Sequence, residues 1–247
     1  MSTPTAWSEF PNGLRLGESE VHLWYASLDP EPVVLHRLET TLTDDERSRG
    51  ERFVFARDRS RFVAARGILR DTLGKYLGEP PAGLRFHDGP NGKPALGGKN
   101  SKAGIRFNLS HSNGMGIYAF SGERELGIDL ELIRPDFAAQ EIAERFFSPS
   151  EIAEWQALPD SSRAEGFFLC WTRKEAYVKA RGEGLTIPLQ SFDVTLTPGE
   201  PAKLNSPDAV RWRLRSFQPA PGYIASMVVE GGSWTPCYWK WAPTKQY

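Results

Sequence analysis

Hydrophobic residues in the first half of the chain follow two different spacings. From Asp58 to Leu77 they recur every three to four positions, which predicts a long amphipathic helix that the Gly-Glu-Pro-Pro stretch from Gly78 ends. Val21–Ala26 instead alternates apolar and polar residues and is rich in β-prone types, which predicts a strand. Further short strands are predicted at 84–86, 105–109, 116–120 and 126–130.

The second half repeats this order of spacings. A second long helix is predicted over 164–180, ended by Gly182 and Gly184, and strands are predicted at 192–196, 212–217, 223–229 and 238–241. Two helix starts carry a capping-box spacing, Thr43 with Glu46 and Ser148 with Glu151. Residues 1–20 are polar and rich in turn formers, so we expect a loose, surface-draped start.

The layout of strand, helix and strands therefore occurs twice. It predicts an α+β protein of two similar subdomains, each a small, mainly antiparallel sheet packed against one long helix. We place the boundary near 121–125, giving subdomains 1–123 and 124–247. No low-complexity linker separates them, so we expect the two halves to pack tightly.

Composition narrows the class of protein without naming a function. Of 247 residues, 40% are hydrophobic and 25% charged, and the net charge of −1 gives no overall attraction to nucleic acid or membranes. Cys170 and Cys237 show no ligand-like spacing, so neither a disulfide framework nor a structural zinc site is expected. No apolar run approaches the roughly 20 residues that span a bilayer, and Met1–Phe10 shows no secretory signal. We therefore expect a cytoplasmic protein.

Two pairs of charged residues are candidates for chemistry. Asp129 and Glu131 stand at i and i+2 of a predicted strand, so both point to one face with Cα atoms about 6.6 Å apart. Taken alone, this pair is better explained as solvated acids on an edge strand. Glu175 and Lys179 stand at i and i+4 of the second long helix and share a face with Trp171. A surface ion pair is the ordinary explanation of that spacing.

Together the three acids suggest a metal site. Asp129, Glu131 and Glu175 would supply oxygen ligands from two elements and leave positions for water and phosphate, as Mg²⁺ prefers. Mn²⁺ is the alternative ion.

Basic residues that could bind an anion lie upstream of these acids. The segment Arg47–Arg70 contains eight arginines and only two acids, and arginine matches phosphate geometry. Part of this run must be a solvated helix face. Lys93 lies in a turn-rich loop, 89–94, and Ser110 and His111 end a predicted strand, where hydroxyl and imidazole groups can bind phosphate. A nucleophilic Ser–His pair is disfavoured, because adjacent residues of a strand point to opposite faces.

The ordered set of these motifs resembles the Sfp-type 4′-phosphopantetheinyl transferases over roughly residues 40–195. The matching stretches are Asn91-Gly92-Lys93-Pro94, Phe107-Asn108-Leu109-Ser110-His111-Ser112, Gly127-Ile128-Asp129-Leu130-Glu131, Phe146-Phe147-Ser148-Pro149-Ser150-Glu151, Trp171-Thr172-Arg173-Lys174-Glu175-Ala176-Tyr177-Val178-Lys179 and Gly182-Glu183-Gly184-Leu185. The arginine-rich segment ending in Arg52-Phe53 also resembles that family. Each motif is weak alone, and their order is specific.

The resemblance implies a pseudo-dimer of two α+β halves and a holo-acyl-carrier-protein synthase activity. Such an enzyme transfers the phosphopantetheine group of coenzyme A to a serine of an apo carrier protein of fatty acid, polyketide or peptide synthesis and releases adenosine 3′,5′-bisphosphate. The resemblance implies that Asp129, Glu131 and Glu175 bind Mg²⁺, that Lys179 assists the leaving group, and that Glu175 or Glu151 is the general base. The residues implied to bind coenzyme A are Lys93, Pro94, Ser110, His111 (at the 3′-phosphate), Lys174 and Lys179. Weaker coenzyme A contacts are implied for Arg49, Arg52 and Arg61.

Two other functions use the same residues. One is a Mg²⁺-dependent hydrolase of coenzyme A-like pyrophosphates, in which water replaces the carrier serine. The other is a coenzyme A-binding module without catalysis, which we rank low because three converging carboxylates require a metal. We expect a monomer that binds neither nucleic acid nor membrane.

Overall fold

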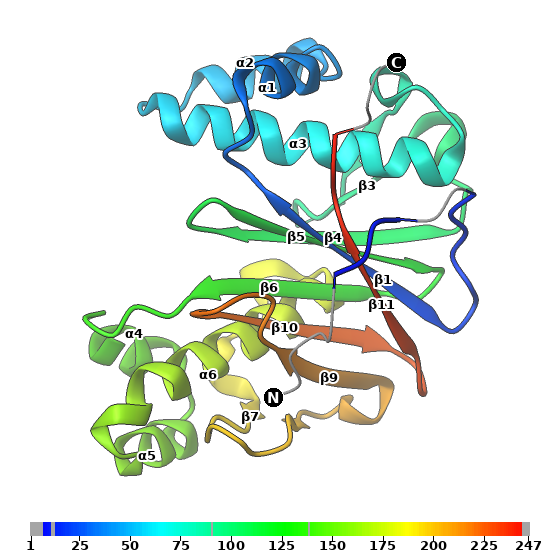
Figure 1. Cartoon of the computed structure of the whole chain (residues 1–247). Helices are drawn as coiled ribbons and strands as arrows, with labels where there is room; N and C mark the ends of the chain where they lie inside the picture. Colours follow the sequence, from blue (N-terminus) through cyan, green and yellow to red (C-terminus); the bar gives the residue numbers. More distant parts are fainter. Residues whose placement is uncertain (1–6, 11–12, 90, 138, 244–247) are drawn as a thin grey trace.

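The computed structural model describes residues 7–10, 13–89, 91–137 and 139–243, in which two helices enclose two sheets. Helix α3 (Ala56–Leu77) covers a sheet of order β11-β1-β5-β4, and helix α6 (Asp160–Arg181) covers a sheet of order β6-β10-β9 (Figure 1). The sheets face each other between the helices. Their strands are β1 (Glu20–Ser27), β4 (Ile105–Ser112), β5 (Met115–Gly122), β6 (Leu126–Leu132), β9 (Trp212–Phe217), β10 (Tyr223–Glu230) and β11 (Thr235–Lys240).

Shorter elements surround these layers. The remaining helices are α1 (Pro32–Glu39), α2 (Asp44–Glu51), α4 (Ala139–Phe146) and α5 (Pro149–Ala157), and the remaining strand pairs are β2 (Phe86–Asp88) with β3 (Pro94–Leu96) and β7 (Asp193–Val194) with β8 (Leu204–Asn205). Short 3-10 turns join several of them.

Alternation along the strands divides the core into three parts. On β1, Leu23 faces the second sheet, whereas Trp24 faces α3, and both side chains are fully buried. On β6, Ile128 and Leu130 pack between the sheets, as their alternation with Asp129 and Glu131 predicted. The acids are thereby left on the α6 side of β6.

Helix ends follow the local sequence. Thr43 with Glu46 and Ser148 with Glu151 form complete capping boxes at α2 and α5, which confirms both predicted starts. The long helices α3 and α6 end at Gly78 and Gly182, whose φ angles of 65° and 67° are left-handed.

The predicted elements are present, with differences at their edges. The α+β class with one long helix per sheet is confirmed, and α6 begins at Asp160 instead of at 164. The short strand predicted at 84–86 lies at Phe86–Asp88, and that predicted at 192–196 is only Asp193–Val194. Helices α1 and α4 and strand β3 were not predicted. Pro90, in the predicted loop 89–94, lies outside the described residues.

The C-terminal strand departs from the division into 1–123 and 124–247. The boundary itself falls between β5 and β6, but β11 leaves the second half and pairs in parallel with β1 of the first (Figure 1). Residue spacing cannot reveal this crossover, because it reports the face of a strand and not its partner. Among the described residues no helix is both long and apolar enough to span a membrane.

Candidate active site

The two sheets meet where β4 runs beside β6, and polar side chains join them there. Alternate β4 residues Asn108, Ser110 and Ser112 point toward β6. Asn108 Oδ1 accepts a hydrogen bond from the Ile128 amide at 2.8 Å, and Ser112 Oγ accepts one from the Leu132 amide at 3.2 Å. Because β4 and β6 belong to different sheets and are not paired by backbone hydrogen bonds, these side chains bond to the β6 backbone instead.

Two of the same side chains hold the acids of β6. Ser110 Oγ donates to Asp129 Oδ1 at 2.9 Å, and Ser112 Oγ donates to Glu131 Oε2 at 2.9 Å. The strand 105–112 therefore positions the carboxylates as well as lining a groove, a role that the sequence analysis did not foresee.

Gly127 brings α6 close to the acidic strand. A Cβ atom at this position would lie 2.2 Å from both the Ala176 oxygen and the Ala180 nitrogen of the helix backbone. Only a residue without a side chain permits this approach. The close contact places Glu175 and Lys179 of α6 beside Asp129 and Glu131.

Lys179 is the cation at the centre of the cluster. Its Nζ donates to Asp129 Oδ1 at 2.6 Å, to Ser110 Oγ at 3.3 Å and to the Ile128 carbonyl at 3.3 Å. The Lys179 side chain is 28% exposed and that of Asp129 only 7%. The ammonium group thus remains within reach of a ligand in the groove, while its carboxylate partner is nearly shielded from water.

The three carboxylates influence one another electrostatically. Burial raises the pKa of Glu175, and the charges of Asp129 and Glu131 raise it further. Burial also raises the pKa of Glu131. The hydrogen bond from Ser112 lowers this pKa, and the charge of Asp129 raises it. Among the described residues, however, the three acids do not form a set whose oxygens all lie within 4.8 Å of one another.

An unsatisfied oxygen tests whether a cation fits this cluster. Asp129 Oδ2 is buried and has no hydrogen-bond partner, although buried carboxylate oxygens normally have one. A cation beside Oδ2 would satisfy it and would offset the repulsion among the three carboxylates. The residues therefore fit a hard divalent ion with oxygen ligands.

A groove in front of the cluster has two lobes. The acidic lobe, of about 630 Å³, is lined by the acids and Lys179 together with Asn91, Lys93, Ser110, Trp171, Gly182 and Gly184. The basic lobe, of about 740 Å³, is lined by residues of α2, α3 and the β2–β3 region. Gly92, Pro94, Leu109 and His111 line both, so the two lobes are continuous.

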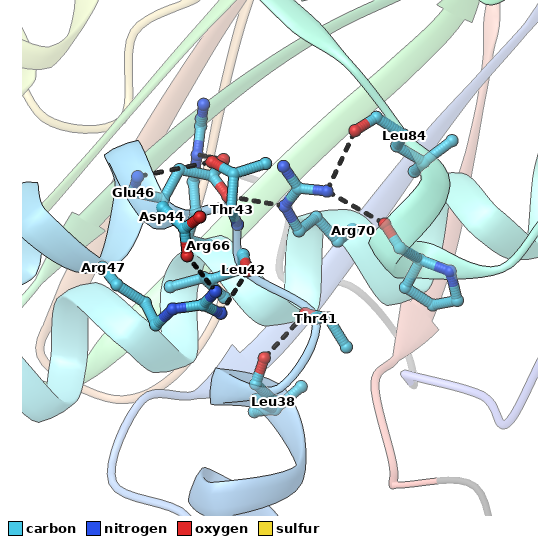
Figure 2. Close-up of polar contacts among 11 residues, drawn as sticks. Leu38, Thr41, Leu42, Thr43, Asp44, Glu46, Arg47, Arg66, Arg70 and Leu84 are labelled. Carbon is cyan, nitrogen blue, oxygen red and sulfur yellow. Dashed lines mark hydrogen bonds and ion pairs between the residues drawn. The ribbon is translucent and has the colours of Figure 1, made fainter.

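An arginine network shapes the basic lobe (Figure 2). Glu46 accepts hydrogen bonds from Arg66 Nε at 2.7 Å and from Arg70 Nε at 2.8 Å. Arg70, only 1% exposed, also donates to the carbonyls of Pro81 and Leu84. Both arginines line the lobe, but Arg70 is held as a structural residue, whereas Arg66, with its side chain 18% exposed, is open to a ligand.

Lys93 and His111, which the family resemblance implied as coenzyme A contacts, both line the groove. Lys93 Nζ donates to Glu125 Oε2 at 3.0 Å and to the Leu126 carbonyl at 2.9 Å, which joins the 89–94 loop to the start of β6. Desolvation and the nearby Lys179 lower the pKa of His111. His111 stands where the two lobes meet, and it is neutral over more of the pH range than a free imidazole.

Lys174 and Glu151 lie elsewhere, which corrects two predicted roles. Lys174 is fully buried and donates to the Leu189 and Phe192 carbonyls at 2.7 and 2.6 Å, with Glu151 at 2.8 Å. All three ammonium hydrogens are thereby used. Glu151, 1% exposed, also accepts from the Ser148 and Val194 amides. Neither residue lines the groove, so we assign Lys174 no phosphate contact and Glu151 no proton transfer.

The three candidate arginines also separate. Arg49 lines the basic lobe, stacked near Phe62. Arg52 is exposed at the end of α2, and Arg61 makes two hydrogen bonds to Asp29, at 2.8 and 2.7 Å. Neither is among the residues that line the groove. Because Arg66 and Arg70 stand four residues apart, the sequence could have placed them on one face of the helix. It could not show that this face meets the β2–β3 region.

Comparisons with known proteins identify the class to which this fold and site belong. The model of the 4′-phosphopantetheinyl transferase superfamily matches residues 125–228, and the model described as 4′-phosphopantetheinyl transferase, N-terminal, matches residues 26–121. The chain belongs to the 4′-phosphopantetheinyl transferase family, and it is a transferase.

Individual relatives agree over most of their length. The chain is 42% identical to the 4′-phosphopantetheinyl transferase HetI of Nostoc sp., over 94% of this chain and 97% of that protein. It is 28% identical to the 4′-phosphopantetheinyl transferase Sfp of Bacillus subtilis, over 76% of this chain and 81% of that protein. A holo-(acyl-carrier-protein) synthase from Bacillus anthracis, solved in complex with CoA (3′,5′-ADP), aligns with 43% of this chain and 94% of its own at 21% identity, with a TM-score of 0.37.

Proposed function

We propose that this enzyme transfers the 4′-phosphopantetheine group of coenzyme A to a serine of an apo carrier protein and releases adenosine 3′,5′-bisphosphate. The observation that carries the proposal is the continuity of two unlike lobes, one rich in arginine and one with three acids around a lysine. Each lobe has the volume of a small-molecule site, about 300–1,000 Å³. A hydrolase or a simple binding module does not account for membership of a transferase family.

The side chains that line each lobe suggest where the two ends of coenzyme A would bind. Guanidinium groups of Arg49 and Arg66 suit the 3′-phosphate, because arginine binds phosphate through paired donors. The acidic lobe suits the pyrophosphate, provided that a cation balances the carboxylates. His111, where the two lobes meet, would also contact the 3′-phosphate, and the loop containing Lys93 and Pro94 would close one side.

Asp129, Glu131 and Glu175 would hold Mg²⁺, with Mn²⁺ as the alternative ion. The unpartnered Oδ2 of Asp129 and the raised pKa of both glutamates support this assignment. When bound, the ion would neutralise charge on pyrophosphate oxygens. Because the three carboxylates are too open to share an ion as they stand, we expect Lys179 to leave Asp129 and the side chains to rotate when substrate binds.

The residues of the chain would then divide the reaction. The serine Oγ forms a bond to the phosphorus that carries pantetheine, and the bond from that phosphorus to the bridging oxygen breaks. Lys179, released from Asp129, would donate a hydrogen bond to the oxygen that leaves with the bisphosphate. Glu175 would accept the serine proton, directly or through water.

Intact-mass measurement of apo carriers tests the reaction. The enzyme, coenzyme A and Mg²⁺ should add one phosphopantetheine group to a competent carrier, whereas release of bisphosphate without carrier would favour the hydrolase instead. Asp129→Asn should abolish transfer while leaving the fold intact by circular dichroism. Asp136→Asn, which removes an exposed carboxylate just beyond β6, is the matched control and should transfer normally. Normal transfer by Asp129→Asn would remove the metal-site assignment.

The monomeric state and the cytoplasmic location remain predictions from the sequence. A panel of fatty acid, polyketide and peptide carriers in the same assay would show which carrier this enzyme prefers.

A further inference from the structure

A second group of metal-ligating side chains lies away from the groove, at the edge of the N-terminal sheet. Glu20 and His22 stand at i and i+2 of β1 and therefore share a face. Cys237 of β11 is the register partner of His22 in the parallel pair. One ligand atom from each of Glu20, His22 and Cys237 lies within 4.8 Å of the other two. None of these three residues lines either lobe.

We propose that Glu20, His22 and Cys237 form a zinc site that fastens the C-terminal strand to the N-terminal sheet. A thiolate, an imidazole nitrogen and a carboxylate oxygen are the ligand types of Zn²⁺, and a thiolate disfavours Mg²⁺. No zinc site was expected from the sequence, because Cys170 and Cys237 show no ligand-like spacing, and Glu20 and Cys237 are far apart along the chain. Only the crossover of β11 brings them together.

The three ligand atoms lie close enough together to share one ion after a small adjustment. His22 Nε2 and Glu20 Oε2 are 3.2 Å apart. Zinc bonds of 2.0–2.3 Å imply ligand separations of roughly 3.3–3.8 Å, so a small side-chain rotation brings the third ligand into range. The Glu20 side chain is 40% exposed, which leaves a route for the ion and a fourth position for water.

Neighbouring groups orient the imidazole ring. His22 is 2% exposed, and its Nδ1 lies 2.8 Å from the Tyr76 hydroxyl of α3. The Trp24 indole donates to the same hydroxyl at 2.9 Å. In either tautomer this contact fixes the ring with Nε2 toward Glu20. Metal-binding histidines are held in this way by a partner on the other nitrogen.

Cobalt substitution tests the site, because a Co²⁺–thiolate bond gives a near-ultraviolet charge-transfer band. The metal-free protein is titrated with Co²⁺ in the presence of excess Mg²⁺, which competes for the carboxylate oxygens of the acidic lobe. We expect a band that saturates at one equivalent and is displaced by Zn²⁺. Tyr76→Phe should weaken Co²⁺ binding by about 10- to 100-fold.

The two cysteines of the chain supply a matched pair of variants. Cys237→Ser should lose the band and keep transferase activity, whereas Cys170→Ser, which alters a buried thiol in the other half, should keep the band. Zn²⁺ should raise the Tm of wild-type protein and not that of Cys237→Ser. Absence of the band, or its persistence in Cys237→Ser, would overturn the zinc site and leave only a His22–Glu20 ion pair. These readouts do not depend on transfer activity.

Discussion

Replacing Glu46 with glutamine should expose how far one buried carboxylate organises the basic lobe. Oε2 of Glu46 accepts from Arg70 Nε at 2.8 Å and from the Thr43 amide at 3.0 Å, while Oε1 accepts from Arg66 Nε at 2.7 Å. Glutamine keeps the shape but has only one oxygen. Whichever way its amide turns, an NH₂ group faces an arginine N–H (Figure 2).

The magnitude follows from burial. Removing one partner of a buried ion pair costs about 3–5 kcal/mol, because the remaining charge is left desolvated. Arg70 is 1% exposed, but the Arg66 side chain is 18% exposed and water can reach it. We therefore expect Glu46→Gln to lower the free energy of unfolding by about 3 kcal/mol, the lower end of that range. Urea unfolding followed by circular dichroism measures this loss.

A control and a pH series make the test sharper. Asp44→Asn breaks an exposed pair with Arg47 on the same helix and should cost less than about 1 kcal/mol. Burial acts to raise the pKa of Glu46, but Arg70, the Thr43 amide and Arg66 together hold it below its usual 4.5. Its contribution is therefore present above 4.5 and is lost as pH falls through the lower folded-state pKa.

The stability gap between wild type and Glu46→Gln should accordingly narrow in acid. A loss no larger than that of Asp44→Asn, or a gap independent of pH, would refute the reasoning. Wild-type affinity for coenzyme A should also exceed that of Glu46→Gln, since Arg66 loses its anchor.

Three further outcomes are expected. Gly127→Ala should displace α6 and lower both the free energy of unfolding, by about 1–3 kcal/mol, and the transferase activity. Gly122→Ala adds a methyl group into open space and should change neither quantity. Equal melting curves for the two variants would contradict this prediction. His111→Ala should weaken binding of coenzyme A more than of 3′-dephospho-coenzyme A in calorimetry, and equal losses would exclude a 3′-phosphate contact. Lys174→Met should cost about 3–5 kcal/mol by leaving Glu151 buried without its cation, yet leave KM for coenzyme A unchanged; a raised KM at normal stability would restore the ligand role.

Local spacing was sufficient for much of the fold. The period of 58–77 predicted a helix that the structure places at Ala56–Leu77, and both capping boxes lie where their residues predicted. Such features depend on contacts within a few residues, which sequence displays directly. Ile128 and Leu130 turn to the core, and Asp129 and Glu131 turn away from it, for the same reason.

The candidate site was only partly visible at this level. The acids, Lys179, His111 and Lys93 lie together along one groove. Lys174 and Glu151 carry the same motif signals but point into a buried pair. A motif records which residue types occur, and it does not record the direction of one helix face relative to another layer.

The amino-acid sequence by itself determined the helices, most strands, the faces on which the acids lie and the family resemblance, because these depend on short-range periodicity and residue type. Only the tertiary structure decided that β11 pairs with β1 and that α6 packs closely against β6 at Gly127. It also decided that Arg66 lines the groove whereas Lys174 is buried away from it. Those outcomes depend on which surfaces pack together, and packing between distant segments is set by the whole core rather than by local spacing.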